Sequence, residues 1–208
     1  MLIIILSYFL GAVPAGYLIN RYFPIINFIS SDKSFLPETI RRNVKLHGSK
    51  VLSIAADLLK GGITVWIVFR LGTRLSGSSF GFLIFPFVSP GLIHVGALIS
   101  VVLGHVFSVY ICGWGGRGVA TALGGFLLLM PEAAIGSIII FIIAAYLKKS
   151  IPFASIVASW ALPVLIWYFY RMNVPYQIAA IFLATLSLIT HYKYLRPETP
   201  ASDSGILN

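Results

Sequence analysis

The stretch Ile151–Tyr170 reads IPFASIVASWALPVLIWYFY and carries no charged side chain over twenty residues. A helix rises about 1.5 Å per residue, so this stretch is long enough to cross the roughly 30 Å hydrocarbon layer of a bilayer. A run of this length and apolarity is typical of a membrane-spanning helix. Much of the remaining chain has the same character.

The composition of the whole chain agrees with this interpretation. Of its 208 residues, 58% are apolar and 10% are charged, and the mean hydropathy is +0.93. Soluble globular chains have about 45–50% apolar and about 25% charged residues. The composition therefore excludes a soluble enzyme, a secreted domain and a disordered chain. The single cysteine, Cys112, excludes a disulfide framework and a cysteine-based metal cluster.

We expect an all-α integral membrane protein, a seven-span helical bundle with its N-terminus outside and its C-terminus in the cytoplasm. The predicted spans are Leu2–Phe23, Val51–Leu71, Gly91–Ile111, Val119–Met130, Ala133–Leu147, Ile151–Tyr170 and Tyr176–Thr190. The fourth is too short to cross alone, and Ser79–Val88 reads as a re-entrant or interfacial stretch. Residues 1–196 would form a single polytopic membrane domain, and the polar tail 197–208 is expected to be disordered.

The positive charges predict the orientation. With seven spans, eleven of the fifteen Lys and Arg residues lie on one side and three on the other, with Lys60 inside a span. Cytoplasmic loops are enriched in Lys and Arg, so the side with eleven is the cytoplasmic one. No basic residue precedes the first apolar run, which argues against a cleavable signal peptide. We therefore expect a multi-pass protein of the cell (inner) membrane with its site facing the cytoplasm.

The net charge of +9 has two compatible explanations. It can be the topology signal together with attraction to anionic lipid headgroups. It can also mark a cytoplasmic site for an anionic, phosphorylated substrate. Nucleic acid is not an expected partner, because the charges are divided among short loops.

The most specific local feature is the segment Gly113–Thr121, which reads GWGGRGVAT between two predicted spans. Glycines allow backbone N–H groups to converge on an oxyanion, and a helix that starts near Gly118 adds its partial positive charge. Arg117 can donate two parallel hydrogen bonds to a phosphate. The segment is either a phosphate cradle or a tight helix connection whose arginine anchors to headgroups. Its spacing is not that of a Walker-type loop, so nucleotide hydrolysis is not indicated.

Four ionisable residues within or at the ends of spans are also informative. Asp57 and Lys60 are three residues apart and share a helical face, so they are either a mutually neutralising pair or a source of substrate ligands. His105, inside a span, is either a buried hydrogen-bond partner or a catalyst. His191, at the end of the last span, is either an anion ligand or an interfacial anchor.

Three motifs of this chain resemble those of the PlsY family, the bacterial acyl-phosphate:glycerol-3-phosphate acyltransferases. GHVFSVY at 104–110 with GGRGVATALG at 115–124 is similar to the second conserved motif of the family. SYFLGAVPAGYL at 7–18 resembles its first span, and DLLKG at 57–61 resembles its D-x-x-K-G motif. The motifs occur in the family's order, and the likeness covers nearly the whole chain.

The chain also departs from the family pattern. The first cytoplasmic loop lacks the family's S-G-N core, and either Asn43-Val44 or Gly48-Ser49 can be aligned with what remains. Arg117 replaces a lysine, and in the last motif Tyr194 stands in place of an asparagine while His191 is kept. In the family's S-x-x-S pair, Pro152 replaces the first serine and Ser155 matches the second.

The resemblance implies transfer of a fatty acyl group from acyl phosphate to glycerol 3-phosphate, giving lysophosphatidic acid for phospholipid synthesis without a metal or another cofactor. Its expected partners are these two substrates and membrane lipids. The expected catalytic residues are Arg117, His191 and His105. The expected ligands of substrate phosphate are Gly115, Gly116, Gly118, Thr121, Arg41, Arg42, Asn43, Lys60 and Ser155, with Asp57 and Lys60 also as a structural pair. The departures favour a second interpretation, a non-catalytic or re-purposed homologue that binds a lipid phosphate or uses another phosphorylated acceptor.

Overall fold

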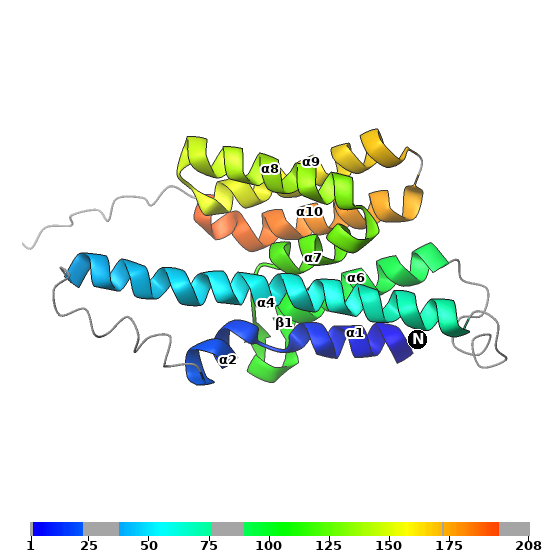
Figure 1. The fold of residues 1–208 in the computed structure, drawn as a ribbon, viewed down its shortest axis with the longest axis horizontal. Coiled ribbons are helices and arrows are strands. Elements are labelled where there is room, and N and C mark those ends of the chain that lie inside the picture. Colours follow the sequence, from blue (N-terminus) through cyan, green and yellow to red (C-terminus); the bar gives the residue numbers. More distant parts are fainter. Residues whose placement is uncertain (1, 23–37, 76–89, 172, 196–208) are drawn as a thin grey trace, which may run out of the picture.

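A computed structural model of the chain describes residues 2–22, 38–75, 90–171 and 173–195 (Figure 1). Its helices are α1 (Leu2–Ala12), α2 (Ala15–Tyr22), α4 (Glu38–Leu75), α6 (Pro90–Val106), α7 (Val119–Leu129), α8 (Pro131–Lys148), α9 (Ile151–Tyr170) and α10 (Val174–Leu195). Two short strands, β1 (Phe107–Ser108) and β2 (Gly113–Trp114), flank a 3₁₀ turn at Val109–Ile111. The two strands have two residues each, and the described structure is otherwise helical, as expected.

Seven apolar helical segments fall on the seven predicted spans. Four are long and apolar enough to cross a membrane, namely Leu52–Leu71 of α4, the whole of α8 and α9, and Val174–His191 of α10. Three are shorter apolar helices, Leu2–Ala12, Gly91–Val106 and Val119–Leu129. The prediction of a helical membrane protein is therefore confirmed.

Three boundaries differ from the predicted ones. The first predicted span is two helices, because Pro14 lacks a backbone N–H and interrupts the chain between α1 and α2. The second begins at Glu38, so part of the predicted first loop is helical. The third ends at Val106, where the hairpin begins. The predicted re-entrant stretch Ser79–Val88 and the tail 197–208 lie outside the described residues.

The helices form two groups with α7 between them (Figure 1). On one side lie α8, α9 and α10, and on the other lie α1, α4 and α6. Leu98, Val102, Phe126 and Ile166 are almost wholly buried in the core that joins the two groups. Large apolar side chains also cover the outer faces of the helices, as expected where a helix faces lipid rather than water.

Glycines allow two pairs of helices to approach backbone to backbone. Gly61 and Gly124 lie where α4 meets α7, and Gly11 and Gly104 lie where α1 meets α6. A Cβ atom on any of the four would overlap a backbone carbonyl oxygen of the facing helix. Small residues at such crossings are typical of helix packing in membranes, where close van der Waals contact replaces the hydrophobic effect.

Candidate functional site

The glycine-rich turn begins where α6 ends. There the chain reverses through the hairpin, in which β1 pairs antiparallel with β2. The N–H of Gly115 then donates to the carbonyl of Val106 (2.9 Å), and the N–H of Gly116 donates to the carbonyl of His105 (3.0 Å). Carbonyls in the last turn of a helix lack intrahelical partners, so these two glycines cap α6.

Two N–H groups of the expected phosphate cradle have other partners in this structure. The N–H groups of Gly115 and Gly116 already have carbonyl partners, so they are not available to an oxyanion. Instead, both glycines allow the turn to pack onto His105, because a Cβ on Gly115 would overlap the His105 carbonyl oxygen and a Cβ on Gly116 would overlap its imidazole Nε2. Gly118 has a φ of +79° and precedes the first residue of α7, a backbone conformation that favours glycine.

Asp57 and Lys60 form an ion pair on α4, with 2.9 Å between Lys60 Nζ and Asp57 Oδ1. Lys60 Nζ is also 2.5 Å from His105 Nδ1 and donates to the carbonyl of Val13 at 3.3 Å. The ammonium group of Lys60 therefore has two hydrogen-bond partners and one ion-pair partner. The side chains are only 11% (Lys60) and 15% (Asp57) exposed. The geometry therefore favours the structural pair over a role for Lys60 as a phosphate ligand.

The same contacts argue against His105 as a catalytic base. Its Nδ1 accepts the short hydrogen bond from the Lys60 ammonium, so in the neutral ring the proton lies on Nε2, a tautomer assigned from the hydrogen-bond pattern. Nε2 lies against Gly116. Neither ring nitrogen is left as a base, and the structure makes His105 a support for the turn.

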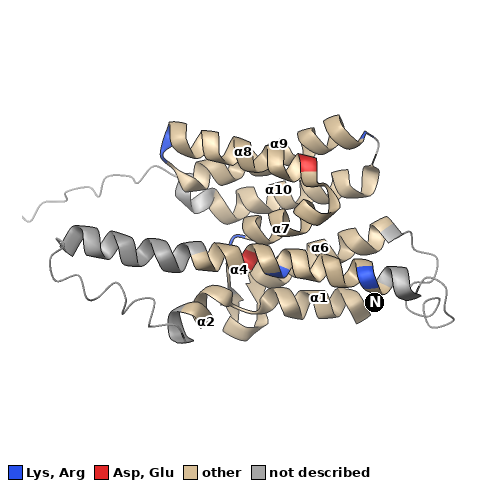
Figure 2. Cartoon of the chain, in the orientation of Figure 1, with Lys and Arg blue, Asp and Glu red and all other residues tan. Residues whose placement is uncertain are grey.

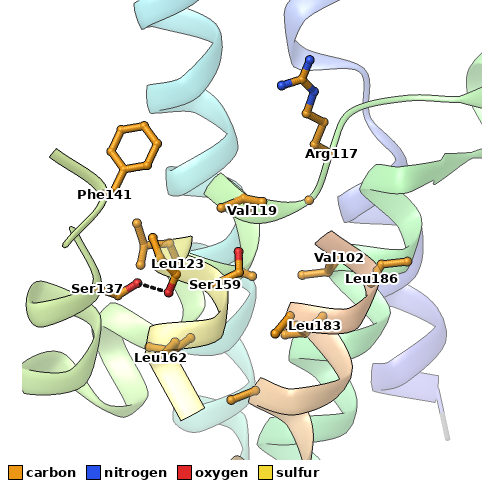
Figure 3. Close-up of a pocket in the computed structure, with 15 residues that line it drawn as sticks. Val102, Arg117, Val119, Leu123, Ser137, Phe141, Ser159, Leu162, Leu183 and Leu186 are labelled. Atoms are coloured by element: carbon orange, nitrogen blue, oxygen red, sulfur yellow. Dashed lines mark hydrogen bonds between the residues drawn. The ribbon is translucent and has the colours of Figure 1, made fainter. Parts of the chain in front are cut away.

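Arg117 lies between the hairpin and α7, and it is half-buried. In Figure 3 its guanidinium group extends away from an apolar cavity, while its backbone lies at one end of that cavity. The hydroxyl of Thr190 on α10 donates to the Arg117 carbonyl oxygen at 3.4 Å. The turn is thus held from α4 and α6 on one side and from α10 on the other. Figure 2 shows few other Lys or Arg residues in the described interior of the bundle.

His191 follows Thr190 on α10, and its side chain is fully buried. Its Nδ1–H donates to the carbonyl of Ser187 at 2.8 Å, which leaves Nε2 as an acceptor in the neutral ring. Nε2 has no hydrogen-bond partner among the described residues, and neither does the buried hydroxyl of Thr121 in the first turn of α7. Buried polar atoms without partners are uncommon and mark places where a ligand or water completes the bonding.

Ser155 is buried near the start of α9. Its carbonyl accepts a hydrogen bond from the hydroxyl of Ser159 at 2.6 Å, and Ser159 Oγ also lies 3.1 Å from Ser187 Oγ. A polar contact between α9 and α10 therefore joins the turn of Ser155 to the residue that anchors His191. Ser187 and Thr190 were not predicted from the sequence, although Ser187 precedes Thr190 by three residues and His191 by four and so shares a face of α10 with them.

Arg41, Arg42 and Asn43 belong to a helix rather than to a loop. All three lie in the N-terminal part of the long helix α4, whose axis continues beyond the other helices (Figure 1). They precede Asp57 by 14 to 16 residues, which corresponds to about 21–24 Å along the helix axis. Their expected role as ligands of substrate phosphate stays a prediction.

The apolar cavity beside Arg117 has a volume of about 50 Å³. Its walls come from α6, α7, α8, α9 and α10, and they include Leu162, Leu183, Ala184 and Ser159. Figure 3 shows Leu162, Leu183 and Ser159 beside the cavity and Ser137 bonded to the backbone of α9. Among the described residues, no three His, Cys, Asp or Glu side chains gather into a metal-binding group.

The fold and the site define a polytopic helical membrane protein with an arginine-bearing turn at the end of a buried polar cluster. The sequence model of the family described as glycerol-3-phosphate acyltransferase matches residues 1–197. The chain is 32% identical over 189 residues to a glycerol-3-phosphate acyltransferase of Trichlorobacter lovleyi, covering 89% of this chain and 87% of the relative. It is 31% identical over 180 residues to one of Fusobacterium nucleatum, covering 86% and 84%. The chain belongs to this family.

Solved structures support the same assignment. The crystal structure of PlsY, an integral membrane glycerol 3-phosphate acyltransferase, in its glycerol 3-phosphate form has a TM-score of 0.67 to this chain at 25% identity. The form with lysophosphatidic acid has a TM-score of 0.69 at 23% identity. Each alignment covers 93% of this chain and 88% of the solved chain. The PlsY resemblance seen in the motifs is therefore confirmed.

Proposed function

We propose that this chain transfers a fatty acyl group from acyl phosphate to the 1-hydroxyl of glycerol 3-phosphate, giving lysophosphatidic acid and inorganic phosphate. The observation that carries this proposal is the family match over residues 1–197. The site adds a half-buried Arg117 beside an apolar cavity. Such a pairing of a cation with apolar walls suits a substrate that has a phosphate at one end and an acyl chain at the other.

The reaction needs no covalent intermediate, because acyl phosphate is already activated. The hydroxyl oxygen of the acceptor forms a bond to the acyl carbonyl carbon, the bond from that carbon to the phosphate oxygen breaks, and the hydroxyl proton leaves with the phosphate. What the protein must supply is the position of the two substrates and the neutralisation of their phosphate charge.

The described residues suggest a division of roles. Arg117 would bind a phosphate in a bidentate manner, aided by the N-terminus of α7 that follows Gly118. The unpartnered Nε2 of His191 would accept a hydrogen bond from the other hydroxyl of glycerol 3-phosphate, the one that does not react. The hydroxyl of Thr121 and the turn of Ser155 would complete the polar wall. Gly115, Gly116, His105 and Lys60 would act through the backbone and packing of the turn rather than by contact with substrate.

The proposal includes the topology. The three shorter apolar helices complete a bundle of seven spans if each crosses as part of the packed domain 1–196, with the N-terminus outside and the C-terminus in the cytoplasm. The eleven-to-three distribution of Lys and Arg supports this orientation, in which Arg117 would lie near the cytoplasmic side of an inner membrane.

The cavity beside Arg117 is our candidate for the first methylenes of the acyl chain. Replacing Ala184 by leucine would fill it, because Ala184 is 1% exposed and lines the cavity. A buried methylene contributes about 0.8 kcal/mol, so displacing two of them lowers kcat/KM for the acyl donor by roughly tenfold. Steady-state kinetics with varied acyl phosphate would measure the loss, and the KM for glycerol 3-phosphate should not change.

Thr185→Leu is the matched control. Thr185 is the next residue on α10 and is exposed on the outer face, so the same leucine would point towards lipid. Equal losses in the two variants would mean that the cavity does not hold the donor.

Product formation by the purified protein tests the function itself. In detergent or nanodiscs, acyl phosphate and labelled glycerol 3-phosphate should give labelled lysophosphatidic acid and inorganic phosphate in a one-to-one ratio. Omission of the acceptor should abolish phosphate release, and acyl-coenzyme A should not replace the donor. If acyl phosphate binds but no product forms with glycerol 3-phosphate, the second interpretation, a non-catalytic or re-purposed homologue, replaces this one.

A further inference from the structure

We propose that Asp57, Lys60, His105 and the Val13 carbonyl form a buried polar clamp that positions Arg117 through the glycine-rich turn. The clamp is defined by the contacts of Lys60 Nζ with Asp57 (2.9 Å), His105 (2.5 Å) and Val13 (3.3 Å). This inference rests on the proposed acyl transfer and assigns a positioning role within it. No residue of the clamp touches substrate in this scheme.

The charged groups of the clamp are energetically unfavourable inside a helical bundle in lipid. Charged side chains within a membrane are costly, and a buried ion pair is often no more stabilising than apolar residues of the same volume. Apolar side chains of the same volume would therefore suffice to hold α4 and α6 together. Because the clamp contacts the glycine-rich turn, we infer that it fixes the position of that turn.

The clamp lies beside two segments in which the backbone is not helical. One is the break between α1 and α2, where Lys60 bonds the Val13 carbonyl and Ser108 bonds the Ala12 carbonyl at 2.5 Å. The other is the hairpin, which α1 also holds through the hydroxyl of Tyr8, 2.7 Å from the Phe107 carbonyl oxygen. The break is thereby tied to α4 through Lys60, and the hairpin is tied to α1.

The final connection runs from the clamp to Arg117. Lys60 orients the imidazole of His105 by bonding its Nδ1, and the opposite edge of the ring lies against Gly116. The carbonyl of His105 accepts the N–H of Gly116, so the ring and the backbone of one residue hold the same glycine. Arg117 is the next residue. A shift of the ring would therefore move the cation, and a displacement of about 1 Å at a catalytic group can cost about a hundredfold in rate.

The test compares two variants of His105. His105→Asn keeps a carbonyl oxygen near the place of Nδ1 and so preserves the acceptor for Lys60, whereas His105→Leu removes it. We expect His105→Leu to lower kcat/KM for glycerol 3-phosphate at least tenfold, and His105→Asn to retain at least a third of the native value. Equal losses in the two variants would overturn the proposal.

A double-mutant cycle separates positioning from general stability. If His105 acts through Arg117, then His105→Leu should change the residual activity of the Arg117→Ala protein by less than twofold, because the group that it positions is gone. If His105→Leu lowered the activity of the Arg117→Ala protein by the same factor as that of the native protein, His105 would act independently of Arg117. That result would overturn the proposal. Should His105→Leu fail to fold, the neutral double variant Asp57→Asn/Lys60→Gln enters the same cycle, because it removes both charges together and keeps hydrogen-bonding groups.

Hydrogen–deuterium exchange distinguishes failure of the clamp from failure of the proposed function. The peptide that covers residues 105–118 should exchange at similar rates in the native protein and in His105→Asn, and faster in His105→Leu. This readout requires no turnover. If the native protein lacks acyltransferase activity, the proposed function fails while the exchange still tests the clamp. Unchanged exchange in His105→Leu would overturn the clamp even in an active enzyme.

Discussion

Replacing Arg117 by alanine should lower kcat/KM for glycerol 3-phosphate by about 10²–10³-fold, the usual cost of removing one donor to a developing or bound anion in an enclosed site. This corresponds to about 3–4 kcal/mol of transition-state stabilisation. The effect should be mainly on activity, because the Thr190 hydroxyl bonds the Arg117 backbone carbonyl and the variant keeps that bond. Steady-state kinetics and a thermal melt of the purified protein would measure the two quantities.

Arg117→Lys is the matched variant, because it keeps the positive charge and restores the residue of the family's motif. A lysine loses the two parallel hydrogen bonds of the guanidinium, so we expect a loss of no more than about tenfold. If alanine and lysine at this position were equally active, phosphate binding by Arg117 would be disproved. If alanine lowered the melting temperature as much as the activity, the loss would reflect folding instead.

The helices were predictable because the membrane imposes a strict length and composition on each of them. Ile151–Tyr170 matches α9 at both ends. Helix ends could not be predicted where tertiary contacts determine the residue at which the helix stops. The sequence at Gly91–Ile111 is apolar throughout, and only the capping of α6 by Gly115 and Gly116 explains why the helix stops at Val106.

In the candidate site, too, local features could be predicted from the sequence and tertiary contacts could not. The sequence singled out the glycine-rich turn, but it suggested the wrong reason for two of the glycines. Gly115 and Gly116 are close to His105 in space and ten residues or more from it in the chain, so their packing could not be read from spacing. The pairing of Asp57 with Lys60 follows from helical periodicity, whereas the third partner, His105, comes from another helix.

The structure thus places a cation on a turn that has little freedom to move. The position of Arg117 depends on contacts from α4, α6 and α10. The contacts with α6 include two backbone hydrogen bonds, and those from α4 and α10 are made by the side chains of Lys60 and Thr190. A polar network of this kind is sensitive to the spacing of the helices that carry it, because a carbonyl or N–H group cannot lengthen to follow a shift. The packing of α4 against α7 therefore matters for the site as well as for the fold.

Gly124→Ala and Gly61→Ala should each destabilise the folded protein by more than about 3 kcal/mol, although alanine favours a helix by about 1 kcal/mol over glycine. A Cβ at Gly124 would overlap the backbone carbonyl oxygen of Leu58, and one at Gly61 would overlap that of Thr121. Neither carbonyl is a flexible side-chain end, so α4 and α7 would have to separate. The apparent melting temperature in detergent should fall by roughly 10 °C, and activity should fall with it because Lys60 and Thr121 lie beside these contacts.

Gly91→Ala controls for the substitution itself. Gly91 lies in α6, and a Cβ there would be 3.8 Å from the hydroxyl of Tyr176, an ordinary contact distance. This variant should melt within about 2 °C of the native protein, since alanine adds no clash and improves helix propensity only slightly near a helix end. If all three alanine variants melted like the native protein, the two helices would not be in backbone contact. The position of Lys60 relative to the turn, and with it the support of Arg117 from α4, would then have to be different.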